Sequence, residues 1–246
     1  MRIIIPIAGS VNFPDSDFVY PKPLIDINDK PLIEYVISNF LGIEDNVSFC
    51  FILKQSLCSE YNLDYTLNQL TSNPLIIILK KQTKGATCSV LMAIDKIPMD
   101  EEIVIANSDQ YFLANIKNAI SFFRSHDAEG GIITFKSVHP RWSFAIVDED
   151  KNVLQTAEKR PISKDAIAGF YYFKTFKSFV EGACNSVLNE DYYNDQIYLS
   201  STINQLILQN KRVKAYQISN ENFFSFYTPQ KIKEFERQIT ENKFNL

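Results

Sequence analysis

A lysine and an aspartate occupy positions from which their side chains could bind a phosphate group and a divalent cation. Lys22 stands between two prolines in the segment YPKPL, and these stiffen its backbone, so little entropy is lost when it binds an anion. Asp109 follows the apolar run 103–106, so we expect its carboxylate at the rim of a sheet, where it would offer Mg²⁺ a hard oxygen ligand. The alternatives are an ordinary surface loop for Lys22 and a turn or helix cap for Asp109.

Two loops that contain glycine are candidates for nucleotide binding. The segment Ala8-Gly9-Ser10 follows the first apolar run, where a flexible loop can turn its N–H groups toward a phosphate chain. In the later segment QTKGAT, Gly85 and Ala86 would let the backbone approach a flat base closely, and the amide of Gln82 can hydrogen-bond a pyrimidine edge. A plain turn between a strand and a helix is the alternative for this second loop.

The elements that must position these residues alternate between short apolar runs and helical periodicity, which is typical of β-α-β units. We therefore predict an α/β fold. In the first part of the chain the predicted strands are 3–7, 47–53, 75–79, 103–106 and 131–135, and the predicted helices are 31–41, 62–71, 87–97 and 115–125. Thr87 is predicted to cap the helix that it opens.

A second pattern begins beyond residue 136, where β-rich segments are joined by polar turns. Its predicted strands are 142–147, 153–157, 168–173 and 213–218, and its predicted helices are 176–188, 201–209 and 229–241. This pattern is expected of an extension of the sheet that carries a pocket for a second substrate.

Length and charge exclude several classes of protein. The chain has 246 residues, of which 46% are hydrophobic, so it can bury one substantial core and a single domain is the default. Its 25 basic and 29 acidic residues give a net charge of −4, so no broad basic face is expected for nucleic acid or an anionic membrane. An apolar run of three residues before Pro6 is too short for a signal peptide, which predicts a cytoplasmic protein.

Seven short strings, in order along nearly the whole chain, resemble the bacterial sugar-phosphate nucleotidyltransferases, and above all the subgroup encoded in capsule and surface-polysaccharide gene clusters. The strings are Ala8-Gly9, Tyr20-Pro21-Lys22-Pro23-Leu24, Lys84-Gly85-Ala86, Ile105-Ala106-Asn107-Ser108-Asp109-Gln110, His139-Pro140-Arg141-Trp142-Ser143, Ala157-Glu158-Lys159-Arg160-Pro161-Ile162-Ser163 and Gly169-Phe170-Tyr171-Tyr172. The resemblance implies a three-layer, Rossmann-like mixed sheet with a β-rich acceptor-binding extension. It implies a single domain 1–246, with a nucleotide-binding half at about 1–135 and an acceptor-binding half at about 136–246.

The same resemblance assigns roles to individual residues. It places Ser108 beside the nucleotide, Asp109 on Mg²⁺, and the pair Glu158 and Lys159 at the acceptor, with Lys159 on the acceptor's phosphate and in a catalytic role with Lys22. Gly169 belongs to the same acceptor site, and Arg141 could hold a second anionic group there. A surface salt bridge is the alternative for Glu158 and Lys159, and packing in the core of the extension is the alternative for Trp142.

The chain departs from the family pattern in two places. The loop that usually carries further glycines and an arginine reads Ser10-Val11-Asn12, so triphosphate binding would depend more on backbone amides, Lys22 and the metal. Ser200 or Ser201 stands where many relatives have a second metal carboxylate, although Asp195 is close in sequence. Asn204 resembles a retained family position without an obvious role.

The expected reaction is attack by a phosphate oxygen of the acceptor on the α-phosphorus of an NTP, with release of pyrophosphate. CTP is favoured as the donor, the acceptor is a sugar phosphate or a non-sugar phosphate such as a phosphorylated amino acid, and the sequence allows a homodimer. A glycosyltransferase of the A type is one alternative, although it normally carries Asp-x-Asp where this chain has Ser108-Asp109-Gln110. A non-catalytic nucleotide-binding regulator is the other.

Overall fold

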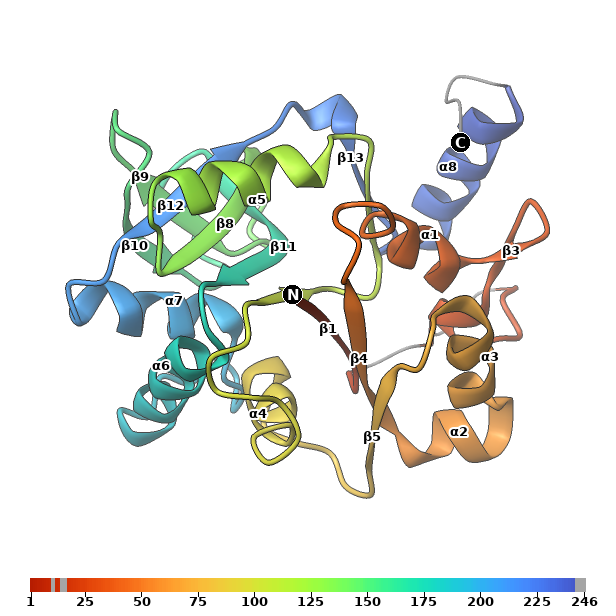
Figure 1. The fold of residues 1–246 in the computed structure, drawn as a ribbon. Coiled ribbons are helices and arrows are strands. Elements are labelled where there is room, and N and C mark those ends of the chain that lie inside the picture. Colours follow the sequence, from red (N-terminus) through yellow and green to blue (C-terminus); the bar gives the residue numbers. More distant parts are fainter. Residues whose placement is uncertain (10–11, 14–16, 242–246) are drawn as a thin grey trace.

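The computed structural model describes residues 1–9, 12–13 and 17–241 (Figure 1). The strands are β1 (Arg2–Ile7), β2 (Asp26–Ile27), β3 (Lys30–Pro31), β4 (Ser48–Lys54), β5 (Leu75–Leu79), β6 (Ile103–Ala106), β7 (Gln110–Phe112), β8 (Gly130–Lys136), β9 (Phe144–Val147), β10 (Val153–Ala157), β11 (Asp165–Phe173), β12 (Val213–Gln217) and β13 (Phe223–Ser225). The helices are η1 (Lys22–Leu24), α1 (Leu32–Ser38), α2 (Gln55–Tyr61), α3 (Leu63–Leu70), α4 (Ala86–Leu91), α5 (Ile116–Ser125), α6 (Phe176–Leu188), α7 (Leu199–Leu208), η2 (Asn220–Asn222) and α8 (Pro229–Thr240). None of these helices is both long enough and apolar enough to cross a membrane.

The N-terminal part of the sheet is parallel. β1 lies between β4 and β6, and β5 extends the sheet beyond β4, so the strand order here is β6-β1-β4-β5. Because these strands run in the same direction, the loops after β1 and β6 leave the sheet at the same edge. This arrangement brings the segment after β1 and the segment that contains Asp109 together.

The long strand β11 joins this parallel part to the rest of the sheet and divides at its middle. Its last residues pair antiparallel with β6, whereas Asp165 and Ala166 pair with β9 on the same side. On its other side β11 pairs with β8, and the register shifts between Ile167 and Tyr171. Gly169 lies in this bulge with φ +59°. The sheet therefore forks where β6 and β9 separate, and this fork forms one side of the site described below.

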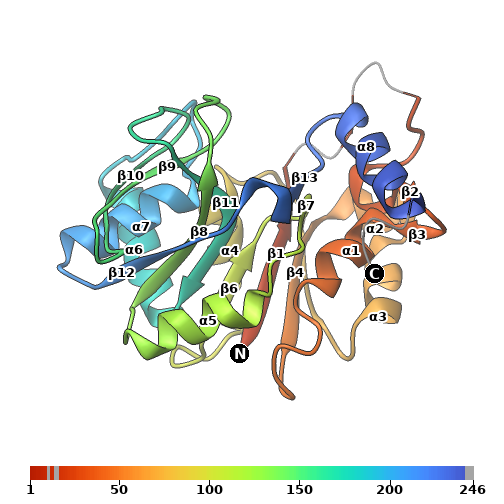
Figure 2. The ribbon, with the colours of Figure 1, turned by 90° about the horizontal axis from the view of Figure 1, so that it is seen from above.

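Helices cover both faces of the sheet, which gives the three layers that the sequence predicts. Alternate residues of β1 belong to different cores: Ile3 and Ile5 pack with α1 and α5, and Ile4 packs with α4, α6 and α7. Figure 1 shows α4, α6 and α7 grouped below the sheet and α5 above it. In Figure 2, α8 lies beside α1, and the rings of Tyr35 and Phe235 from these two helices are 5.4 Å apart.

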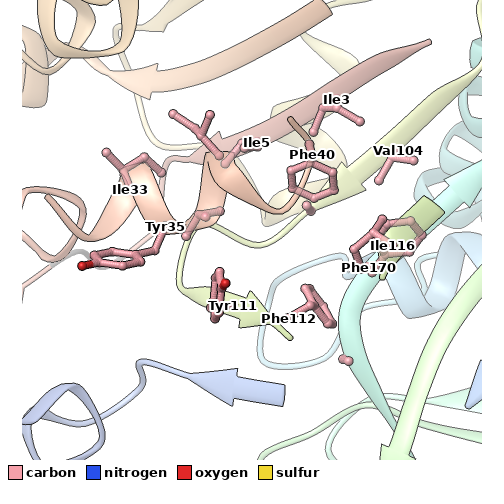
Figure 3. Close-up of a cluster of buried hydrophobic side chains, with 14 of the residues drawn as sticks. Ile3, Ile5, Ile33, Tyr35, Phe40, Val104, Tyr111, Phe112, Ile116 and Phe170 are labelled. Carbon is pink, nitrogen blue, oxygen red and sulfur yellow. The ribbon is translucent and has the colours of Figure 1, made fainter. Parts of the chain in front are cut away.

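Aromatic side chains fill the core on the α1 side (Figure 3). Phe40 stacks on Phe170 of β11 with ring centroids 6.4 Å apart, and Phe112 of β7 meets the same ring edge-on at 6.5 Å. The core therefore fixes β7, which follows Asp109, against the helix α1 and the forked strand. Asn39 adds two hydrogen bonds, because its Nδ2 donates to the carbonyl of Gln110 and its Oδ1 accepts from the N–H of Phe112.

The structure confirms the predicted fold class and corrects several local predictions. Thr87 was predicted as a helix cap, but α4 begins at Ala86 with Gly85 at its N-cap, so Thr87 lies inside the helix. This helix also ends at Leu91 rather than at residue 97. Hydrogen-bonded turns follow it, and they bury Ala93 and Ile97 as the predicted helix would have done. Helix α2 and the pair of short strands β7 and β13 are not among the predicted elements.

Candidate functional site

The loops after β1 and β6 enclose a cleft of about 220 Å³ at the carboxyl edge of the parallel strands, which we call the strand-end cleft. Its lining residues are Pro6, Ile7, Ala8, Gly9, Lys22, Pro23, Gln82, Thr83, Gly85, Ala86, Ser89, Asn107, Ser108, Asp109, Gln196 and Tyr198. All the residues predicted to bind the nucleotide line this cleft except Ser10, which lies outside the described residues.

Lys22 and Asp109 meet at this cleft although 87 positions separate them in the sequence. The Nζ of Lys22 lies 2.9 Å from Oδ2 of Asp109, and the two side chains are only 15% and 24% exposed. Lys22 begins η1, where Pro21 precedes it and Pro23 is buried, so the short helix is held in place by the two prolines. The carbonyl of Asp109 accepts a hydrogen bond of 2.9 Å from the N–H of Phe226, which fixes its backbone.

Gly85 allows a distant segment to pass against the loop that contains Gln82. The φ of Gly85 is +101°, and a Cβ at this position would lie 2.4 Å from the carbonyl oxygen of Ile197. The N–H of Ile197 also donates to the carbonyl of Lys84 at 2.9 Å. A residue with a side chain at Gly85 would therefore push away the segment that brings Gln196 and Tyr198 to the cleft.

A second hollow of about 420 Å³ opens where the sheet forks, and we call it the fork cavity. Its lining residues are Ala86, Asn107, Asp109, Gln110, Arg141, Trp142, Ser143, Glu158, Lys159, Ile167, Gly169, Tyr171, Tyr198, Leu199, Ser225 and Tyr227. The four residues predicted to bind the acceptor, Arg141, Glu158, Lys159 and Gly169, are all among them. The two hollows share Ala86, Asn107, Asp109 and Tyr198, so they adjoin at Asp109.

Glu158 is partly buried in the wall of the fork cavity. Its Oε2 accepts hydrogen bonds from the hydroxyl groups of Ser143 and Ser200, and the second of these measures 2.9 Å. Burial raises the pKa of the Glu158 carboxyl, and the two hydroxyl groups and Lys159 offset part of that rise. A partly buried carboxylate that accepts hydrogen bonds from two hydroxyl groups differs from a surface salt bridge, which was the alternative for this residue.

The raised pKa of Glu158 predicts how stability depends on pH. The folded protein binds the proton of the Glu158 carboxyl group more tightly than the unfolded chain does. As the pH rises from 4.5 through the raised pKa, the free energy of unfolding of the wild type should therefore fall relative to that of Glu158→Gln. Below pH 4.5 the difference should stay constant. Urea unfolding of both proteins between about pH 4 and about pH 8 measures it. If the free energy of unfolding of the wild type instead rises relative to that of Glu158→Gln with increasing pH, the pKa of Glu158 is not raised in the folded protein.

Lys159 reaches into the fork cavity from a residue with φ +50°. Its Nζ donates to the hydroxyl oxygen of Tyr198 at 3.1 Å and lies 5.3 Å from the ring centre of Tyr193. The hydrogen bond to Tyr198 and the charges of neighbouring groups raise the pKa of Lys159 against the opposing effect of burial. Lys159 is thus a fully protonated cation that the aromatic rings hold in position.

The residues around Asp109 provide one carboxylate for a divalent metal. Over residues 1–9, 12–13 and 17–241, no three His, Cys, Asp or Glu side chains come together at a possible metal site. Ser200 points to Glu158, the hydroxyl of Ser201 donates to the carbonyl of Asp191, and Asp195 lines neither hollow. Asp109 fits Mg²⁺ if water and substrate phosphate oxygens complete the coordination, which is a common way for proteins to bind this ion.

Asn204, whose role the sequence left open, has a structural one. Its Oδ1 accepts from the N–H of Thr156 at 2.7 Å and its Nδ2 donates to the carbonyl of the same residue at 2.8 Å. The side-chain amide of Asn204 thus satisfies both backbone hydrogen-bonding groups of Thr156 in β10, as a neighbouring strand would. These bonds fix α7 beside the edge of the sheet.

Asn107, Gln110 and Tyr198 are among the polar lining residues that the sequence did not single out as site residues. Gln110 is 3% exposed, and its Oε1 is buried without a hydrogen-bond partner among the described residues, which is rare for a native protein. Asn107 and Gln110 flank Asp109 in a string that already resembled the family, so that string was a signal for both. Tyr198 had no comparable signal, because its contact with Lys159 depends on the packing of α7.

Comparison with known families assigns the chain. The model of the nucleotidyl transferase family matches residues 18–223. The chain belongs to this family. The family match therefore agrees with the resemblance that the seven strings predict, and it covers Lys22, Asp109 and all four residues of the predicted acceptor site.

Individual members and structures resemble this nucleotidyl transferase over different lengths. The bifunctional protein GlmU of Methanocaldococcus jannaschii is 25% identical over 158 residues, which are 62% of this chain and 35% of that protein. The chain thus spans about a third of the length of the curated relative that it matches. The nucleoside-diphosphate-sugar pyrophosphorylase from Vibrio cholerae RC9 has the same fold, with a TM-score of 0.82 and 21% identity over 97% of this chain and 100% of the other. The inositol-1-phosphate CTP transferase from T. maritima has a TM-score of 0.72 and 14% identity over 98% and 96% of the two chains.

Proposed function

We propose that this member of the nucleotidyl transferase family joins the NMP part of an NTP to a small phosphorylated acceptor and releases pyrophosphate. The observation that carries the proposal is that the strand-end cleft and the fork cavity adjoin at Asp109. Lys22 lines the strand-end cleft and is hydrogen-bonded to this aspartate, and Lys159 lines the fork cavity. A reaction between two polyanions needs such a place, because the enzyme must align them and neutralise their charge.

In this proposal each hollow holds one substrate. The triphosphate lies in the strand-end cleft against Gly9 and Lys22, and the base lies against Gln82 and Gly85. The phosphate of the acceptor lies in the fork cavity at Lys159. One of its oxygens attacks the α-phosphorus of the NTP where the two hollows adjoin at Asp109. A phosphate monoester is already ionised near neutral pH, so the step needs no general base. Mg²⁺ on Asp109, when bound, would stabilise the negative charge of the phosphate oxygens.

We further propose CTP as the donor, and a role in the synthesis of capsule or surface-polysaccharide precursors. Gln82 and Gly85 both line the strand-end cleft, so an amide and a close backbone are available to a pyrimidine edge. The same fold occurs in the inositol-1-phosphate CTP transferase from T. maritima and in the nucleoside-diphosphate-sugar pyrophosphorylase from Vibrio cholerae, which supports CTP as one possible donor for this fold. The acceptor in this proposal is a sugar phosphate or a non-sugar phosphate.

Pyrophosphate release from a panel of nucleotides tests the proposal. The protein would be incubated with CTP, UTP, ATP, GTP or dTTP, with Mg²⁺, and with each of a set of phosphorylated acceptors. We expect pyrophosphate to appear only when nucleotide and acceptor are both present, and the highest rate with CTP. Release of nucleoside diphosphate from a nucleotide sugar would instead support a glycosyltransferase, and binding of nucleotide without turnover would support a regulator.

A further inference from the structure

We infer that the acceptor carries a carboxylate in addition to its phosphate, and that Arg141 binds this carboxylate in the wall of the fork cavity. The inference rests on the proposed function, because it names a chemical class for the acceptor of the same site. It rests on three observations about the cavity: the position of Arg141, its lack of an acidic partner among the described residues, and the other polar groups that line the cavity.

Arg141 lies between two hollows and is held there by aromatic rings. It lines the fork cavity and also a cavity of about 560 Å³ beside α8, whose lining includes Phe223 and Lys231. The guanidinium carbon lies 3.5 Å from the ring centre of Tyr227 and 5.7 Å from that of Trp142. Stacking of this kind fixes the plane of the guanidinium and leaves its edge for a ligand.

The guanidinium of Arg141 has no acidic partner within the described part of the chain. Its Nε donates to Nδ1 of His139 at 3.2 Å, and the ion pairs of the neighbouring elements join other residues, such as Lys231 with Glu234 and Lys136 with Asp165. Burial lowers the pKa of Arg141, and Glu221 and Glu234, which line the cavity beside α8 together with Arg141, form no ion pair with it. A partly desolvated cation without a counter-ion is costly, and an anion that binds there removes the cost.

The rest of the fork cavity already has polar groups for the other end of the acceptor. Lys159 is bonded to Tyr198 in the wall of the cavity and provides a cation for the phosphate. Gln110 also lines the cavity, and rotation of its amide, whose Oε1 has no partner among the residues described, would present a hydrogen-bonding group to a hydroxyl or amino group of the ligand. Arg141 is thus left for a second anion, and its planar fork suits a carboxylate, which it can bind through two parallel hydrogen bonds.

Pairs of acceptors that differ by one carboxylate test the inference. Suitable pairs are O-phosphoserine with O-phosphoethanolamine, and glucuronic acid 1-phosphate with glucose 1-phosphate. In at least one pair we expect the wild type to favour the carboxylate by about tenfold to about 100-fold in kcat/KM. Arg141→Gln should bring this ratio close to one, and Arg141→Lys should give an intermediate ratio, because a lysine provides the charge without the planar fork.

Arg160→Gln is the matched control, because it removes the same charge from an exposed residue next to Lys159 that does not line the fork cavity. It should leave the ratio as in the wild type. The inference is overturned if the wild type shows no preference in either pair, or if Arg141→Gln lowers both members of a pair by the same factor. If no acceptor supports pyrophosphate release, the proposed function fails, and calorimetric binding of the same pairs to the wild type and Arg141→Gln still decides the inference.

Discussion

Replacing Asp109 with alanine is expected to lower kcat/KM for pyrophosphate release by at least about 10³-fold, because charge stabilisation at the transferring phosphate would be lost. Asp109 lines both hollows and is bonded to Lys22 at 2.9 Å. Among the described residues that line the strand-end cleft, Asp109 provides the one carboxylate, and the variant removes it. We expect the protein to remain folded, because the hydrogen bond from Phe226 reaches the carbonyl of residue 109 and does not depend on its side chain.

Asp95→Ala is the control for this experiment, because it removes an exposed carboxylate that is paired only with the neighbouring Lys96. Both variants and the wild type would be compared by initial rates and by thermal unfolding. Nucleotide binding measured by calorimetry at several Mg²⁺ concentrations adds a second readout, since the variant should lose the dependence of nucleotide affinity on Mg²⁺. Asp109 is not the metal ligand if its variant keeps activity within about tenfold of the wild type while Asp95→Ala behaves in the same way.

Three strands could be predicted with their bounds because short segments rich in apolar or β-branched residues end at polar or charged neighbours. The bounds of β5, β6 and β10 agree with the prediction, and β6 is fully buried whereas β5 and β10 also contain exposed residues. In contrast, α2 buries only Leu57, so its sequence QSLCSEY has no apolar stripe that predicts a helix. The strands β7 and β13 have three residues each and exist because they pair with one another across more than 100 positions, which no local pattern predicts.

The candidate site could be predicted one segment at a time, but the contacts between segments could not. Lys22, Asp109 and Lys159 were recognisable because proline neighbours, a preceding strand and a family string mark them. The hydrogen bond between Ser200 and Glu158 joins residues 42 positions apart, whereas the sequence marked Ser200 or Ser201 only as standing where many relatives have a second metal carboxylate. A single sequence gives the residue types of such a site, whereas the docking of α7 against β10 decides which side chains face each other.

The fork of the sheet explains why two hollows meet at one aspartate. The N–H of Asn107 donates to the carbonyl of Gly169 at 3.0 Å, and the N–H of Ile167 donates to the carbonyl of Ser143 at 2.8 Å. The two ends of the bulge in β11 therefore hold the segment after β6 and the start of β9 apart. The fork cavity lies between them, and Asp109, two residues beyond Asn107, stands at its junction with the strand-end cleft.

Gly169→Ala is therefore expected to have a large effect on activity although it adds a single methyl group. A Cβ at this position would lie 2.2 Å from Oε1 of Gln110 and 2.3 Å from Nδ2 of Asn107, so both side chains would have to move. A φ of +59° also costs about 1–2 kcal/mol for a residue with a Cβ. Because displacement of positioning groups by about 1 Å can cost about 10²-fold in rate, we expect kcat/KM to fall by about 10²-fold or more.

Gly42→Ala separates the backbone effect from the steric one. Gly42 has φ +72°, and a Cβ there would find no atom within 4 Å, so this variant carries the backbone cost alone. We expect a modest loss of thermal stability in Gly42→Ala with kcat/KM near that of the wild type, and a larger loss of both in Gly169→Ala. If the two variants lose the same stability and Gly169→Ala keeps its activity, then Asn107 and Gln110 can move without consequence, and the fork cavity does not hold the acceptor in the way that we propose.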